Sequence, residues 1–130
     1  QGKEDILMIS IIMKRDMDLI RKILLVAESD AHGLRPKLEI QDYTQEEIQY
    51  HTFLLGEAGL AKVVNETTFG SKSPEAIFIN LTWQGHEFLD SARENQIWNQ
   101  AKDAIGKIGG ASIPIWTALL TELIKKRLGL

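Results

Sequence analysis

The sequence predicts an α+β fold in which helices and short strands alternate. A helical pattern spans Gln45–Ala58 and is stopped by Gly59, and a strand-like run at Leu60–Val64 follows directly. A second strand-like run, Ala76–Leu81, lies beyond the polar segment Asn65–Glu75, as expected for a hairpin with a long loop. A helix that leads into a hairpin is typical of a winged helix-turn-helix-like domain, with the hairpin as the wing. We therefore expect the order helix, strand, helix and two-stranded wing, with additional C-terminal helices.

The first half of the chain contributes one more helix and a short strand. Apolar residues recur at three- and four-residue spacing through Asp16–Ala27, which predicts an amphipathic helix. Pro36 disfavours a helical conformation at Arg35, so the helix should end before this point. Apolar and charged residues alternate at Leu38–Ile40, as in a short strand. Thr44 and Glu47 have the spacing of a capping box, so the next helix should begin at residue 45.

The C-terminal third predicts two further helices. Thr82 is placed to cap a third helix that continues to about Lys102 or Ile108. The glycine-rich segment 109–112 ends it, and Pro114 fits the first turn of a last helix, Ile113–Leu128. Backbone N–H groups of residues 109–112 could face an anion, but no P-loop lysine is present and a flexible hinge is favoured.

The chain divides into three predicted parts. Residues 1–12 are interpreted as a cloning remnant or a non-native leader, with translation starting at Met8 or Met13; a genuine N-terminal strand is the equal alternative. Residues 13–108 should form the winged-helix domain. Residues 109–130 should form a glycine hinge and an amphipathic C-terminal helix.

Composition excludes several classes of protein. The chain has 130 residues, a net charge of −3 and no cysteine, so disulfides and thiolate sites are excluded and a cytoplasmic location is expected. No segment approaches the roughly 20 apolar residues that span a bilayer. His32, His51 and His86 show neither metal-ligand spacing nor a recognisable acid–base arrangement. We therefore expect no enzymatic activity, no metal and no cofactor.

The second helix is acidic where a DNA-reading helix would be basic. No Lys or Arg occurs from Leu38 to Ala61, and the acids in this stretch are Glu39, Asp42, Glu46, Glu47 and Glu57. Because contacts with phosphates dominate DNA affinity, this charge disfavours DNA binding.

The two faces of the second helix carry different residues. At 100° per residue, one face should pack into the core and consists of Ile48, His51, Leu55 and Ala58. The other face consists of Glu46, Gln49, Tyr50, Phe53 and Glu57. Aromatic anchors with a polar rim favour a protein interface. The alternative is that Tyr50 and Phe53 pack within the same chain, under the wing or the last helix. His51 is expected to be a buried histidine bonded to backbone or to a carboxylate.

The last helix has an apolar face too wide for a free surface. It comprises Ile113, Trp116, Leu119, Leu120, Leu123, Ile124 and Leu128. We expect Trp116, Leu120 and Leu123 to contact a partner or a second copy, although the hinge also allows the helix to fold back on its own domain. An amphipathic membrane helix is disfavoured because its basic residues lie only at one end.

Two motifs resemble a known family. They are Leu54-Leu55-Gly56-Glu57-Ala58-Gly59-Leu60 and Leu81-Thr82-Trp83-Gln84-Gly85-His86-Glu87-Phe88-Leu89, supported by Met13–Ile20 and Ile97-Trp98-Asn99. Together they resemble a bacterial, prophage-associated winged-helix family of unassigned function, from Met13 to the C-terminus. The resemblance implies the fold and a homodimer formed through terminal helices. One departure is that residues 30–43 leave no room for the helix that normally precedes the recognition helix.

The sequence favours a non-enzymatic accessory or regulatory module of phage or prophage origin that acts through protein–protein contacts. The interface should consist of Glu46, Gln49, Tyr50, Phe53, Glu57, Trp116, Leu120 and Leu123. The alternative is a DNA-binding transcriptional regulator of the winged-helix type. Its DNA contacts would be Arg15, Gln49, Tyr50, Lys62 and Lys72.

Overall fold

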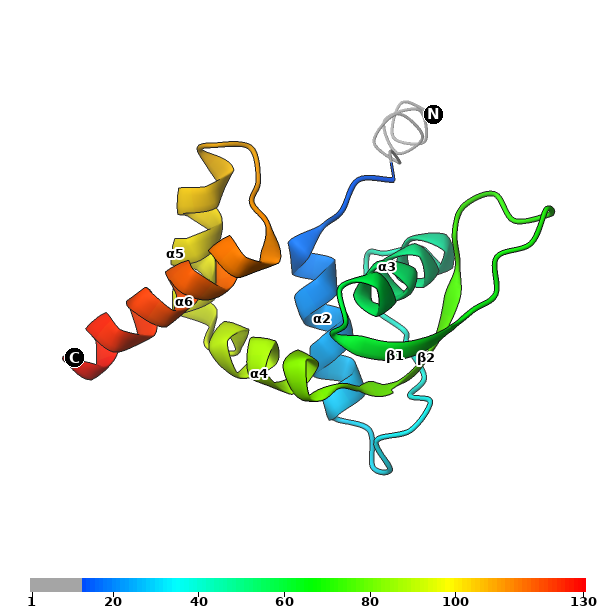
Figure 1. Ribbon diagram of the computed structural model, residues 1–130, viewed down its shortest axis with the longest axis horizontal. Helices are drawn as coiled ribbons and strands as arrows, with labels where there is room; N and C mark the ends of the chain where they lie inside the picture. The colour runs from blue at the N-terminus through cyan, green and yellow to red at the C-terminus, as the bar shows by residue number, and fades with distance from the viewer. Residues whose placement is uncertain (1–12) are drawn as a thin grey trace.

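The computed structural model describes residues 13–130, and this part of the chain contains five helices and a two-stranded antiparallel sheet (Figure 1). The elements are α2 (Met17–Glu28), α3 (Gln45–Glu57), β1 (Ala61–Asn65), β2 (Ala76–Leu81), α4 (Trp83–Ala92), α5 (Asn95–Gly106) and α6 (Ile113–Leu128). The α+β prediction is therefore confirmed, and the arrangement is compatible with a winged-helix-like domain. The predictions for residues 1–12 lie outside the described residues. None of the described helices has the length and apolar character needed to cross a membrane.

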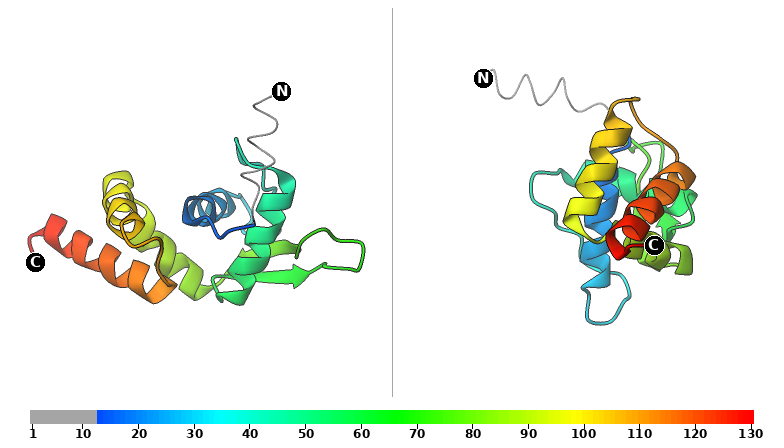
Figure 2. Two further views of the ribbon diagram at one scale, coloured as in Figure 1. Left: turned by 90° about the horizontal axis from the view of Figure 1, so that it is seen from above. Right: turned by 90° about the vertical axis from the view of Figure 1, so that its left-hand side faces the viewer.

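Helix α2 lies at the centre of the molecule. Figures 1 and 2 show α3 and the hairpin on one side of it and the C-terminal helices on the other. Asp16 caps the helix by accepting hydrogen bonds from the backbone N–H groups of Asp18 and Leu19. The predicted apolar stripe is buried, and Leu19, Ile23 and Leu24 are fully inaccessible to solvent. Helix α2 therefore contributes buried side chains to the packing on both of its sides.

The hairpin packs directly on α3. Strands β1 and β2 pair from Ala61↔Leu81 to Asn65↔Ala76, with a bulge between Lys62 and Val63. Helix α3 contacts both strands, and a side chain at Gly56 would overlap the Val63 side chain. This glycine therefore allows the helix and the first strand to approach closely.

The two sequence motifs meet at the junction between the hairpin and α4. Thr82 caps α4 through its bond to the Gly85 N–H, and its hydroxyl also donates to the Gly59 carbonyl at 2.6 Å. The Thr82 N–H donates to the Leu60 carbonyl, and a methyl group at Gly85 would overlap that same carbonyl oxygen. Gly59 itself has φ +73°, which glycine adopts without strain. The two motifs thus determine the close contact between residues 59–60, after α3, and residues 82–85, at the start of α4.

The predicted strand at Leu38–Ile40 is wrong. Leu38 and Ile40 are half-buried and Glu39 is exposed, so the alternation is present, but the segment joins no ladder. Only the Arg35 N–H before it bonds to the sheet, donating to Ile79 O at 2.7 Å. No helix forms between residues 29 and 44, in agreement with the predicted loss of the helix that would precede α3.

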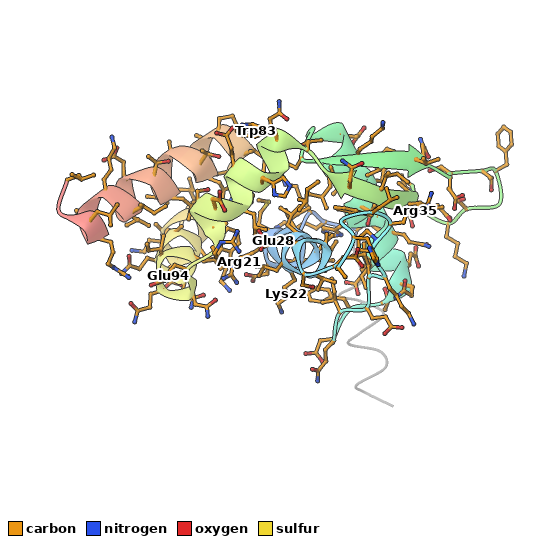
Figure 3. The ribbon with its side chains drawn as sticks, turned by 90° about the horizontal axis from the view of Figure 1, so that it is seen from below. Arg21, Lys22, Glu28, Arg35, Trp83 and Glu94 are labelled. Atoms are coloured by element: carbon orange, nitrogen blue, oxygen red, sulfur yellow. The ribbon has the colours of Figure 1, made fainter. Side chains whose placement is uncertain are left out.

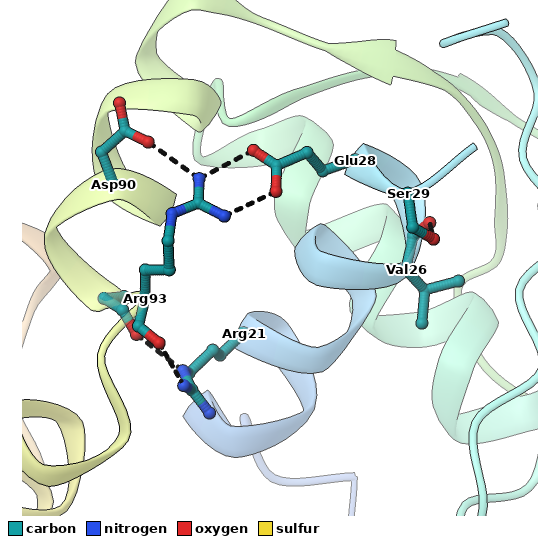
Figure 4. Close-up of polar contacts among 7 residues, drawn as sticks. Arg21, Val26, Glu28, Ser29, Asp90 and Arg93 are labelled. Carbon is teal, nitrogen blue, oxygen red and sulfur yellow. Dashed lines mark hydrogen bonds and ion pairs between the residues drawn. The ribbon is translucent and has the colours of Figure 1, made fainter. Parts of the chain in front are cut away.

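The predicted continuous third helix is also wrong, because the chain breaks between α4 and α5. Glu94 caps α5 by accepting from the Ile97 N–H at 2.9 Å. Arg21 of α2 donates to the carbonyl oxygens of Ala92 at 2.6 Å and Arg93 at 2.7 Å (Figure 4). These carbonyls would otherwise accept hydrogen bonds within a longer helix, so Arg21 stabilises the break.

Helix α6 folds back on its own chain. Gly109 and Gly110, with φ +84° and +138°, reverse the chain after α5, a backbone conformation that glycine adopts without strain. Trp116 then stacks on Trp98 of α5 with ring centroids 4.6 Å apart. At the other end of α6, Arg127 forms an ion pair with Glu94 at 2.7 Å. The helix therefore packs on α4 and α5 along its length.

Candidate interaction surface

The outer face of α3 is the predicted interface, and the structure places its polar residues in solvent. Glu46, Gln49 and Glu57 are exposed, whereas Tyr50 and Phe53 are half-buried. Neither aromatic side chain is among those packed against the hydrophobic core, and the Tyr50 ring lies edge-on to His51 at 5.5 Å. The two aromatics are thus partly covered by their own chain and partly available to a partner.

The loop between β1 and β2 reaches the start of this face. The Ser73 hydroxyl donates to a Glu46 carboxylate oxygen at 3.0 Å. Hydrogen bonds within the loop join Thr67 to Glu75 and Thr68 to Ser71. Phe69 lies in the turn of this loop with its side chain fully exposed. Sequence reasoning did not select Phe69, although a lone aromatic residue in the polar segment 65–75 was a visible signal.

The residues of the DNA-binding alternative come from three different elements. Lys62 is exposed on β1 and Lys72 on the loop between β1 and β2. Arg15 lies before α2, and its guanidinium donates to Ala111 O at 3.0 Å. Arg15 also lines a small cavity together with Leu54 and Glu57. Arg15 is thus already engaged with the segment that enters α6. These cations do not come from α3 itself, so the acidic character of the helix is retained.

The inner face of α3 matches the prediction except at one position. Ile48, His51 and Leu55 are buried as expected, but Ala58 is exposed. Thr52 is buried in addition, and its hydroxyl donates to the Ile48 carbonyl at 2.8 Å. The difference arises because Ala58 follows the last turn, where the chain already leaves the core.

His51 joins α3 to the start of α2. Its Nδ1–H donates to the Glu47 carbonyl and its Nε2 accepts from the Asp16 N–H, both at 2.8 Å, which defines a neutral ring. Burial lowers the pKa of His51 and outweighs the hydrogen bond that the ring donates to Glu47 O, which raises it. The Tyr43 hydroxyl donates to the Asp16 carboxylate at 3.1 Å, and burial followed by that negative charge raises the pKa of Tyr43. His51 is therefore a structural histidine, as predicted.

On the side of α2 that faces α4 and α5, charged side chains form hydrogen bonds between the helices (Figure 3). Asp18 accepts from the Trp98 indole at 2.7 Å and from the Lys102 ammonium at 2.9 Å. Burial raises the pKa of Asp18, but these two hydrogen bonds together with the positive charges of Lys102 and Lys22 outweigh burial and keep the pKa below its usual value. Glu28 accepts both N–H groups of the Arg93 guanidinium, at 2.6 and 2.7 Å (Figure 4). These contacts fix α4 and α5 against α2.

The predicted interface residues of α6 divide into two groups. Trp116 and Leu120 are 4% and 0% exposed, since they pack in the core of this chain. They are thus unable to contact a partner unless α6 moves away. Leu123 is half-buried, and Ile115 and Leu128 are exposed on the same helix. The wide apolar face of α6 is therefore covered mainly by α4 and α5.

The described residues contain no group of three or more His, Cys, Asp or Glu side chains arranged to hold a metal ion. The fold and its surface define a small α+β protein with a helix–hairpin unit and an acidic exposed helix face. The chain belongs to the family described as Hypothetical protein (DUF2513), which residues 14–112 match. A relative from Haemophilus influenzae, described as an uncharacterized protein, is 40% identical over 95 residues. The match covers 72% of this chain and 79% of that relative. No solved structure matches the chain.

Proposed function

We propose that this protein is a non-enzymatic accessory or regulatory module of the winged-helix type, encoded by a prophage or similar element, that acts through protein–protein contacts in the bacterial cytoplasm. The observation that supports the proposal is the outer face of α3. It presents two half-buried aromatic side chains, Tyr50 and Phe53, among exposed acidic and amide groups, with no cation on the helix. Aromatic residues within a polar rim are typical of protein interfaces.

The charge of this face defines the kind of partner. Glu46 and Glu57 are exposed near the two ends of the helix, and Gln49 lies between them. A partner with a basic surface would gain favourable long-range attraction, and the aromatic side chains would bury the apolar area. Duplex DNA has the opposite charge requirement, since its phosphates repel acidic side chains.

Self-association through α6 is a second part of the proposal. Because Trp116 and Leu120 are committed to the core and Leu123 packs partly against it, a homodimer would use the exposed residues Ile115 and Leu128 with the accessible part of Leu123. Sedimentation of the wild-type protein should then show a dimer, and Ile115→Asp with Leu128→Asp, two exposed positions, should convert it to a monomer. A monomeric wild-type protein at about 100 µM would contradict this part alone, because that concentration exceeds the Kd of most specific dimers.

The test of the main proposal is charge reversal on α3. Immobilised protein should retain a specific host or phage protein, identified by mass spectrometry, and Glu46→Lys with Glu57→Lys should abolish retention. The matched control is Glu87→Lys with Asp103→Lys, two exposed acids on α4 and α5 that receive the same change of charge. Equal retention by both double variants would contradict the proposal. Tyr50→Ala with Phe53→Ala should abolish binding as well while leaving the far-ultraviolet circular dichroism unchanged.

The second candidate, a DNA-binding transcriptional regulator, is favoured by one observation, the position of the hairpin directly after α3. In that case Gln49 and Tyr50 would read bases, and Arg15, Lys62 and Lys72 would contact phosphates. Titration of labelled duplex DNA at low salt separates the two functions. We expect no binding at micromolar protein. Affinity that falls linearly with salt on a double-logarithmic plot would instead favour the regulator.

A further inference from the structure

An open cavity of about 680 Å³ lies on the opposite side of α3 from the proposed interface, where four segments converge. It is lined by the residues at the start of α2, by Glu47 and His51 of α3, by the end of α5 and by the glycine segment with the start of α6. Its wall includes Lys14, Arg15, Met17, Lys102, Gly110 and Trp116. The volume falls in the range of small-molecule sites, which is about 300–1,000 Å³.

The acidic side chains of the wall already accept hydrogen bonds from this chain. Asp16 accepts from two backbone N–H groups and from the Tyr43 hydroxyl. Asp18 accepts from Trp98 and Lys102, as described above. Glu47 accepts from the backbone and hydroxyl of Thr44. The acceptors that face the cavity are therefore largely occupied.

The basic side chains of the wall have donors to spare. Lys14 has no hydrogen bond or ion pair within residues 13–130, and Arg15 makes one hydrogen bond, from one terminal nitrogen to Ala111 O. A guanidinium carries five N–H donors, so the anchored Arg15 retains several that can bind an anion. The anchor also restricts the side chain before a ligand arrives, which reduces the entropy lost on binding.

Trp116 supplies a third donor without a partner. The residue is 4% exposed, and its indole Nε1 has no hydrogen-bond acceptor in the described residues. Its stacking partner differs, because the Trp98 indole donates to Asp18. A buried N–H without an acceptor costs about 1–3 kcal/mol. The atom itself is covered in this structure, so a ligand acceptor recovers that cost only after a small shift of the side chains that cover Nε1.

We propose that this cavity binds a small organic anion, a carboxylate attached to an apolar body. The carboxylate accepts hydrogen bonds from Trp116 Nε1 and from the Arg15 and Lys14 side chains. Met13, Met17 and Ile105 on the same wall contact the apolar body. The site does not use the outer face of α3, so it stands or falls independently of the proposed protein contacts.

The test uses the three indole N–H resonances in a ¹⁵N-labelled full-length protein, assigned through single Trp→Phe variants. Benzoate is the probe, and benzylammonium is the control of similar shape and opposite charge. Benzoate should shift the Trp116 resonance downfield in a saturable manner, while the exposed Trp83 resonance stays in place. Saturation by benzylammonium to the same extent, or no saturable shift below about 10 mM benzoate, would overturn the proposal.

Variants then locate the anion contacts. Lys14→Gln with Arg15→Gln should weaken benzoate binding about tenfold, since losing charge-assisted hydrogen bonds of about 1.4 kcal/mol changes the Kd by that factor. The matched control, Lys62→Gln with Lys72→Gln, removes the same charge from the hairpin and should leave the Kd unchanged. If both double variants bind equally, the contacts assigned to Lys14 and Arg15 are wrong and the proposal fails.

Discussion

The two sides of the molecule use charged residues in different ways. Around α2, α4 and α5, Asp18, Arg21 and Arg93 each form two or more hydrogen bonds or ion pairs within the chain. On the outer face of α3, Glu57 forms no side-chain hydrogen bond or ion pair within residues 13–130, and Glu46 accepts a single hydrogen bond, from the Ser73 hydroxyl. Composition alone treats these groups alike. Their hydrogen-bond partners show which charges stabilise the fold and which remain available to a partner.

The largest effect should come from breaking the junction that connects the two sides. Gly85→Ala places a methyl group on the Leu60 carbonyl, which is backbone and has little freedom to move. The free energy of unfolding should fall by about 3 kcal/mol, measured by urea denaturation. Gly106→Ala is the control, because nothing lies within 4 Å of its added methyl group and alanine favours the helix. A similar loss in both variants would mean that the junction is not the cause.

Removing one of the committed charges should have the next largest effect. Asp18→Ala leaves the buried Trp98 indole without an acceptor and Lys102 without its ion pair. We expect the free energy of unfolding to fall by about 2 kcal/mol. Glu122→Ala breaks an exposed ion pair of 3.7 Å with Lys125 and should change stability by less than about 0.5 kcal/mol. An equally small loss of stability in Asp18→Ala would show that the Asp18 carboxylate does not stabilise the fold.

The buried histidine should make stability depend on pH. Since burial holds the pKa of His51 below its usual value of 6.5, the unfolded chain binds a proton more readily than the folded chain. The free energy of unfolding should thus be constant above about pH 7 and decrease as the pH falls below about 6.5, by about 1 kcal/mol. Urea denaturation between pH 5 and pH 8, about the range where histidine titrates, measures this. His51→Gln should remove the decrease; a variant that keeps it would assign the effect to other groups.

The smallest effect should come from the outer face of α3. Glu57 is exposed, has no hydrogen-bond partner within residues 13–130 and lies in the last turn, where a negative charge opposes the helix dipole. Glu57→Gln should therefore raise the free energy of unfolding slightly, by about 0.3 kcal/mol. Thermal unfolding of the two proteins in parallel resolves such a difference. A loss above about 1 kcal/mol would show that Glu57 stabilises the fold after all.

Elements with a clear local pattern were predictable from the sequence. The apolar stripe of α2, the capping box of α3 and Pro114 of α6 each set an end or a face that the structure reproduces within one or two residues. The strand predicted at residues 38–40 does not form, because alternating burial is a local pattern whereas a strand also needs a neighbouring strand with free hydrogen-bonding groups. The break after α4 was not predicted, because the residue that stabilises it, Arg21, lies about 70 residues away in sequence.

The surface was predictable in charge but not in exposure. The absence of cations on α3 follows directly from the sequence, and the structure leaves that helix acidic. The coverage of an apolar face is not contained in the helix that carries it, so the packing of Trp116 and Leu120 within this chain could not be predicted. The same holds for the cavity beside Trp116, whose walls come from four segments that are distant in sequence. Such sites depend on long-range contacts rather than on local spacing.

The exposed loop between the two strands has a consequence for proteolysis. Phe69 stands at its tip with Gly70 beside it, so chymotrypsin, which cleaves after aromatic residues, should reach this bond in the native protein. A cut there would produce two fragments that each carry one strand of the sheet. The hydrogen bonds between β1 and β2 and the packing on α3 would hold the fragments together. The cleaved protein should therefore elute as one species under native conditions and as two in denaturant.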